Sequence, residues 1–86
     1  MKAKDLEQSI FDLEKIRVVV RANNNVEFQN YNWVNRADEG STITNWISNR
    51  IKPTFGDFPV VVIDGYGGIP HGGTTLKKLR LTYRTE

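Results

Sequence analysis

The sequence contains no cysteine, a single histidine and no long apolar run. Without cysteine, the chain has no disulfide, no zinc or iron–sulfur site built on thiolates and no thiol nucleophile. The longest apolar stretch, residues 59–63, is too short to span a bilayer, and the N-terminus lacks the apolar core of a signal peptide. Small secreted domains usually need disulfides, so we expect a cytoplasmic protein without a membrane partner.

The 86 residues are enough for one hydrophobic core, and we expect a single α+β domain over residues 1–86. The net charge is +2, but it is unevenly spread, since residues 50–86 hold six basic side chains against three acidic ones. This balance disfavours a strongly acidic surface that imitates nucleic acid, and it allows a basic face.

Hydrophobic periodicity predicts two helices and four strands. Residues 3–14 carry apolar side chains at helical spacing, and residues 15–21 then alternate, which predicts a strand with Ile16, Val18 and Val20 on one face. Three asparagines form a turn before a second predicted strand over residues 26–34.

The second half of the chain predicts one further helix and two further strands. A helix capped by Ser41 or Thr42 is expected to end at Pro53, because proline cannot continue the hydrogen-bond ladder. The apolar residues 58–63 predict a central strand. Residues 76–84 alternate again and predict a last strand with Leu79, Leu81 and Tyr83 facing inward.

The predicted fold is therefore a four-stranded sheet with two helices on one face, in the order αββαββ. Over residues 15–84 this order of elements resembles a β-grasp, or ubiquitin-like, domain. The chain does not end in the diglycine of a conjugated modifier.

The glycine-rich residues 64–73 hold the only histidine. Asp64 and His71 suggest an acid–base pair, with Thr74 or Thr75 as a nucleophile, but a histidine in a glycine-rich hairpin loop lacks rigid support. The loop also fails as a phosphate cradle, because its spacing does not match G-x-G-x-x-G and it leads into a predicted strand. Carboxylates are scattered. We therefore expect no catalytic residue, no cofactor and no metal.

Three surfaces are candidates for binding a partner. The glycine-rich loop is long for a hairpin and carries Tyr66, Ile69 and His71. A second candidate is the segment with Tyr31 and Trp33, whose aromatic and asparagine side chains suit base stacking or a protein hot spot. The third is a basic sheet face, which would suit phosphates or an acidic protein patch and consists of Arg17, Arg21, Lys78, Arg80 and Arg84.

In size, absence of cysteine and lack of a chemical motif, the chain resembles the small anti-CRISPR proteins of phages and mobile elements. This resemblance implies a stoichiometric inhibitor that docks on a CRISPR effector and blocks target-DNA binding or nuclease recruitment. Many such inhibitors are acidic DNA mimics, and the +2 charge departs from that pattern. We expect a non-enzymatic binding protein whose partner is a protein or ribonucleoprotein complex. The alternative is a nucleic-acid-binding protein that uses the basic sheet face. Monomer and homodimer both remain open.

Overall fold

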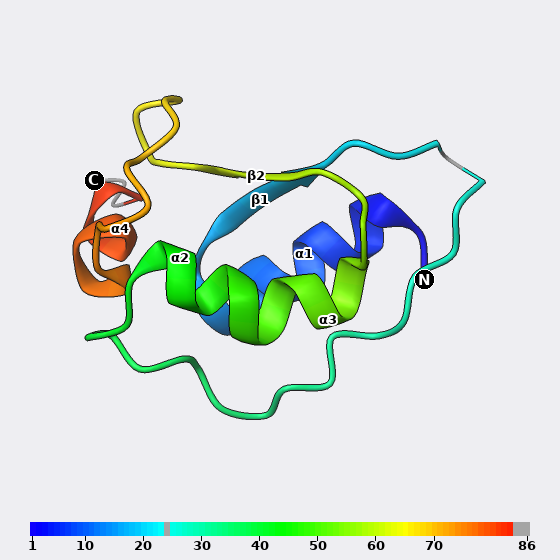
Figure 1. The fold of residues 1–86 in the computed structure, drawn as a ribbon, viewed down its shortest axis with the longest axis horizontal. Coiled ribbons are helices and arrows are strands. Elements are labelled where there is room, and N and C mark those ends of the chain that lie inside the picture. Colours follow the sequence, from blue (N-terminus) through cyan, green and yellow to red (C-terminus); the bar gives the residue numbers. More distant parts are fainter. Residues whose placement is uncertain (24, 84–86) are drawn as a thin grey trace.

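The computed structural model of the chain describes residues 1–23 and 25–83. Three helical segments and one two-stranded antiparallel sheet are present in that part of the chain, and the middle helical segment runs without interruption through three stretches (Figure 1). The elements in order are α1 (Ala3–Glu14), β1 (Arg17–Val20), α2 (Ile43–Trp46), η1 (Ile47–Ile51), α3 (Lys52–Phe55), β2 (Val60–Ile63) and α4 (Leu76–Thr82).

The strands β1 and β2 form a ribbon that lies over α1 and the continuous helix 43–55, while α4 packs at one end (Figure 1). The long connection over residues 21–42 has no helix or strand at its described positions, apart from an isolated bridge between Thr42 and Thr75. No helix within the described residues is long and apolar enough to cross a membrane.

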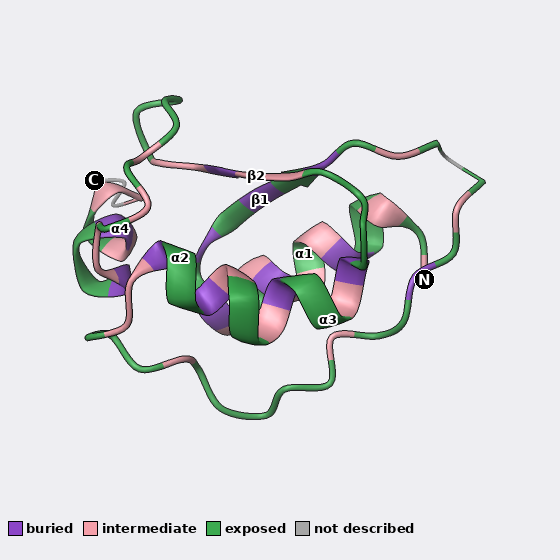
Figure 2. Ribbon diagram, in the orientation of Figure 1, coloured by how far each residue is buried: buried purple, intermediate pink, exposed green. Residues whose placement is uncertain are grey.

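One hydrophobic core joins all of these elements, and Figure 2 shows its buried positions gathered where the helices face the ribbon. Every helix and both strands contribute to it. Its buried aliphatic and aromatic side chains include Leu6, Ile10, Val18, Trp46, Ile51, Val62, Leu76 and Leu79.

The first two predicted elements are confirmed. Helix α1 begins and ends where the apolar spacing placed it, and Lys15 ends it in a left-handed conformation (φ 59°). In β1 the even-numbered valines are buried and Arg17 is exposed, as period-two alternation requires. The structure therefore belongs to the predicted α+β class.

The predicted four-stranded sheet is wrong, and so is the β-grasp order that depended on it. The sheet of the described chain has two strands, with Val18 paired with Val62 and Val20 with Val60. Residues 26–34 form no strand. Asparagines at 30 and 32 have low strand propensity, and the aromatic residues in this segment do not alternate, so no face of it could be buried continuously.

The second helix does not stop at Pro53. Thr42 caps it by accepting a hydrogen bond from the N–H of Asn45, but the helix widens to a π-helical turn over Ile47–Ile51 and continues to Phe55. The N–H of Lys52 donates to the carbonyl of Ile47, five residues back. Pro53 then sits in the first turn of α3, where a missing N–H costs little.

The last predicted strand is a helix. Thr75 caps α4 by accepting a hydrogen bond from the N–H of Lys78, and Leu76 and Leu79 are buried on one helical face. Leu81, predicted to face inward, is 55% exposed. The glycine-rich loop therefore joins a strand to a helix, and it is not a hairpin connection.

Candidate functional site

The predicted basic sheet face does not form. Arg17 and Arg21 are exposed on or beside β1, whereas Lys78 and Arg80 belong to α4. Lys78 is exposed and Arg80 is half-buried, turned toward the core. Arg84 lies outside the described residues. The four described cations of the predicted surface therefore lie on two separate parts of the structure, beside β1 and on α4.

Arg17 packs beside the aromatic end of α1. Its guanidinium carbon lies 5.9 Å from the ring centre of Phe11, and the rings of Phe11 and Tyr83 pack perpendicular to each other with 6.2 Å between centroids. The hydroxyl of Tyr83 accepts a hydrogen bond from the backbone N–H of Arg17 and donates one to the carbonyl of Ile63. It thereby bridges the two strands at the end of the ribbon.

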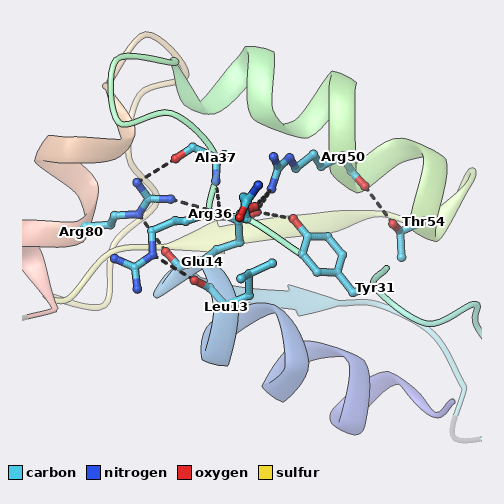
Figure 3. A network of polar contacts seen from close by, with 9 residues as sticks. Leu13, Glu14, Tyr31, Arg36, Ala37, Arg50, Thr54 and Arg80 are labelled. Carbon is cyan, nitrogen blue, oxygen red and sulfur yellow. Dashed lines mark hydrogen bonds and ion pairs between the residues drawn. The ribbon is translucent and has the colours of Figure 1, made fainter. Parts of the chain in front are cut away.

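Two other predicted contact residues, Tyr31 and Arg80, meet at a buried carboxylate (Figure 3). Glu14 is completely buried at the end of α1. Its Oε2 accepts hydrogen bonds from the hydroxyl of Tyr31 at 2.6 Å and from Nη1 of Arg50 at 2.7 Å. Its Oε1 accepts from the N–H of Ala37 at 2.9 Å and from Nη2 of Arg80 at 3.1 Å. We call these five residues the Glu14 cluster.

The cluster holds Glu14 in its charged form. Burial opposes ionisation, but hydrogen bonds from Tyr31, Ala37 and Arg50 outweigh burial and lower the pKa of Glu14. The indole N–H of Trp46 contributes through its proximity, although it forms no hydrogen bond of normal geometry within the described residues.

Burial also shifts the pKa values of two groups that surround Glu14. Burial, and then the neighbouring carboxylate of Glu14, raises the pKa of Tyr31. Burial also lowers the pKa of Arg80, although Glu14 opposes that effect. With every oxygen of the carboxylate occupied and water excluded, the Glu14 cluster has the composition of a structural ion network and offers no open position for a substrate.

Arg50 and Arg36 tie the long loop to the helices. Arg50 Nη1 also donates to the carbonyl of Asn35 at 2.7 Å, and its guanidinium stacks 4.3 Å from the ring centre of Trp33. Nε of Arg36 donates to the carbonyl of Leu13 at 3.0 Å. Trp33 is 44% exposed, so one part of its ring packs on Arg50 and the remainder faces solvent.

Sequence reasoning missed Glu14 and Arg50. A signal for Glu14 was present, since it continues the spacing of the buried Leu6 and Ile10 along α1 and is the one charged residue in that stripe. Nothing in the local sequence marks Arg50, whose partners lie 15 and 36 residues away.

The glycine-rich loop has a defined conformation. Oδ1 of Asp64 accepts hydrogen bonds from the N–H groups of Tyr66 and Gly68, both at 2.9 Å, and the N–H of Asp64 donates to the carbonyl of Gly68 at 2.9 Å. Gly65 packs directly against α4, where a Cβ at this position would fall 1.6 Å from the carbonyl oxygen of Thr82. Turn hydrogen bonds therefore fix residues 64–68.

Two predicted contact residues of this loop point into solvent, with Tyr66 85% and Ile69 76% exposed. His71 is also exposed, and its Nδ1 accepts a hydrogen bond from the N–H of Gly73 at 2.9 Å. Asp64 and His71 thus each bond the backbone of the loop, and no hydrogen bond joins them in the described chain. Their combination as an acid–base pair has no geometric support.

Within residues 1–23 and 25–83, no group of three or more histidine or acidic side chains is placed to hold a metal ion. Comparison of the chain with protein-family models, with curated proteins and with solved structures found no match.

Proposed function

We propose that this chain is a non-enzymatic protein-binding module that contacts its partner through the loop residues Tyr66 and Ile69. The observation that carries the proposal is the exposure of these two large side chains, with Tyr66 inside the turn that Asp64 fixes and Ile69 directly after it. An aromatic and an aliphatic side chain held ready in this way suit the centre of a protein interface, because little conformational entropy is lost on binding.

The proposal extends to the mode of action. We infer a stoichiometric inhibitor that occludes a surface of a macromolecular complex. Because the chain resembles the small anti-CRISPR proteins, a CRISPR effector is the first partner to test. The exposed apolar side chains support a protein partner. The basic face on which a nucleic-acid-binding role rested is divided between β1 and α4.

The test compares wild-type protein with the double variant Tyr66→Ala/Ile69→Ala in a titration against a purified CRISPR effector complex. We expect a one-to-one complex that the double variant weakens by about 2 kcal/mol or more, as hot-spot truncation does. Val34→Ala is the matched control, since Val34 is 86% exposed and lies on the other long loop. Equal affinity of wild type and double variant for a bound partner would contradict the assignment of this loop.

The nucleic-acid alternative is tested with short single- and double-stranded DNA and RNA, by fluorescence anisotropy at about 50 and 200 mM salt, because phosphate contacts weaken steeply over that range. The proposed protein-binding role predicts no tight, salt-sensitive complex. Such a complex would instead support the alternative and direct mutation to Arg17 and Arg21.

A further inference from the structure

An open groove lies where the long loop meets the start of α3. It has a volume of about 260 Å³, and the residues that line it are Gln29, Asn30, Asn32, Trp33, Pro53 and Thr54. None of these six residues is charged. The groove lies outside the glycine-rich loop, so the protein contact proposed for that loop does not account for it.

Trp33 gives the groove an aromatic wall that is fixed in place. Its ring is 44% exposed, although the guanidinium of Arg50 stacks on it at 4.3 Å from the ring centre. Arg50 is held in turn by Glu14 and by the carbonyl of Asn35, both at 2.7 Å. A series of contacts that starts at a buried carboxylate therefore positions an exposed indole. A ligand that packs on this ring has little side-chain entropy to remove.

Uncharged amides lie beside the ring. The side chains of Gln29, Asn30 and Asn32 are exposed, and none of them takes part in a hydrogen bond within the described residues. The side-chain hydrogen bonds of this part of the loop come from Tyr31 and Arg36 instead. Each amide can donate through its NH2 group and accept through its oxygen. The groove therefore presents both donors and acceptors to a ligand, and it carries no charge that would select an ion.

We propose that this groove binds one unit of an uncharged saccharide. The C–H groups on one face of a sugar ring pack on the electron-rich face of an indole. The hydroxyls at the edge of the sugar donate and accept hydrogen bonds, as the side-chain amides do. The volume of the groove lies just below the range of about 300–1,000 Å³ that drug-sized ligands occupy, which fits a single sugar ring.

Two other classes of ligand match the groove less well. A nucleic acid would stack a base on Trp33, but its phosphates would meet an uncharged lining, and Arg50 is already bound by Glu14. A proline-rich peptide offers carbonyl acceptors and few donors, and it docks in grooves lined by several aromatic rings. Trp33 is the one aromatic residue among the six described residues that line this groove. The mixture of one ring and three amides therefore favours a sugar.

The test is an NMR titration of the isotope-labelled protein with trisaccharides of glucose, mannose and N-acetylglucosamine. At least one of them should shift the indole N–H of Trp33 and the NH2 signals of Asn32, with a dissociation constant of about 1 mM or lower. Trp33→Ala should weaken this binding about tenfold or more, because the stacking surface is lost. Val34→Ala is the matched control, since Val34 is the next residue, is 86% exposed and does not line the groove. Its affinity should equal that of wild type.

Asn32→Asp is a second variant that leaves the contact of Trp33 with Arg50 in place. It keeps the shape of an exposed side chain but replaces a donor with a charged oxygen, so it should also weaken binding, and circular dichroism should show that every variant folds. No shift from any of the trisaccharides at about 10 mM overturns the proposal. Shifts of Trp33 that adenosine, cytidine or a polyproline peptide causes and the sugars do not would also overturn it.

This site and the proposed protein contact are tested separately. The double variant Tyr66→Ala/Ile69→Ala should bind the trisaccharide as wild type does, because neither residue lines the groove. Loss of protein binding in that variant therefore bears on the loop alone, and loss of sugar binding in Trp33→Ala bears on the groove alone.

Discussion

Arg80 covers the end of helix α1 by binding both the side chain and the backbone of Glu14, a residue 66 positions earlier in the chain. Its Nη2 lies 3.1 Å from Oε1 of Glu14, and its Nε donates to the carbonyl oxygen of the same residue at 2.8 Å. A cation is favoured at a helix C-terminus, where unsatisfied carbonyls carry partial negative charge. One side chain thus shares with Arg50 the neutralisation of the buried carboxylate and also binds the last carbonyl of the helix.

Glu14→Gln should strongly destabilise the fold. Glutamine keeps the shape of the side chain but leaves Arg50 and Arg80 without a counter-charge in a buried setting, which costs about 3 kcal/mol. Urea unfolding followed by circular dichroism measures the loss. Glu27→Gln is the control, because Glu27 also pairs with two cations but is exposed, and its midpoint should barely change. Equal losses in both variants would refute a special role for burial.

Acid should unfold the protein through the same carboxylate. The pKa of Glu14 is lower in the folded state than its ordinary value of 4.5, so the unfolded state binds more protons at acidic pH. The stabilisation is fully present above 4.5 and is lost as pH falls through the folded-state pKa. The pKa of Glu27 also falls, to about 2, through Lys2 and the N-terminal amine, but Glu27 is exposed and solvent screens these ion pairs, so it adds little to the pH dependence. The free energy of unfolding, measured from about pH 6 to 3, should fall less steeply in Glu14→Gln than in wild type.

Tyr83→Phe should loosen one end of the ribbon. The lost hydroxyl leaves the N–H of Arg17 and the carbonyl of Ile63 without their shared partner, at a cost of about 1 kcal/mol. Hydrogen exchange at the Arg17 amide should accelerate more than exchange at Val19. Tyr66→Phe removes a hydroxyl from an exposed ring and serves as the control. An unchanged Arg17 amide would show that the bridge contributes nothing in solution.

Gly65→Ala should disrupt the contact between the loop and α4. The added Cβ would fall 1.6 Å from the carbonyl oxygen of Thr82, which forces the backbone apart and costs about 2 kcal/mol. Gly68→Ala is the control, because it makes the same substitution in the same loop. A Cβ at Gly68 would lie 3.6 Å from its nearest neighbour, a carboxylate oxygen of Asp64, which is ordinary contact. We expect thermal unfolding to separate the two variants, with a reduced midpoint only for Gly65→Ala.

The sequence was sufficient to predict α1 and β1, because one local pattern fits each of them. It was not sufficient at residues 76–83, where Leu79, Leu81 and Tyr83 fit a strand while Leu76, Leu79 and Tyr83 fit a helix. Two features favour the helix: Thr75 caps its first turn, and leucine, lysine and arginine have high helix propensity. The alternation of apolar residues alone does not reveal this preference.

The remaining errors have non-local causes. The helix passes Pro53 because a π-helical turn precedes it, and no residue pattern announces that turn. Residues 26–34 are held by contacts far along the chain, such as Tyr31 to Glu14 and Phe28 to the rings of Phe55 and Phe58. Among the candidate contact residues, the exposure of Tyr66 and Ile69 can be predicted from the long glycine-rich loop that contains them. The partial burial of Arg80 cannot, because it depends on the distant Glu14.

The Glu14 cluster also bears on how the chain folds during its synthesis. The ribosome completes α1 early, yet the last partner of its buried carboxylate, Arg80, is added only after 65 further residues. Until then Arg50 can neutralise Glu14 but Arg80 cannot, so burial of Glu14 carries a larger desolvation penalty than in the native state. Contacts of such high sequence separation slow folding, and the native state should form in one cooperative step after the α4 segment leaves the exit tunnel. Nascent chains arrested before Arg80 should accordingly remain sensitive to protease along their whole length.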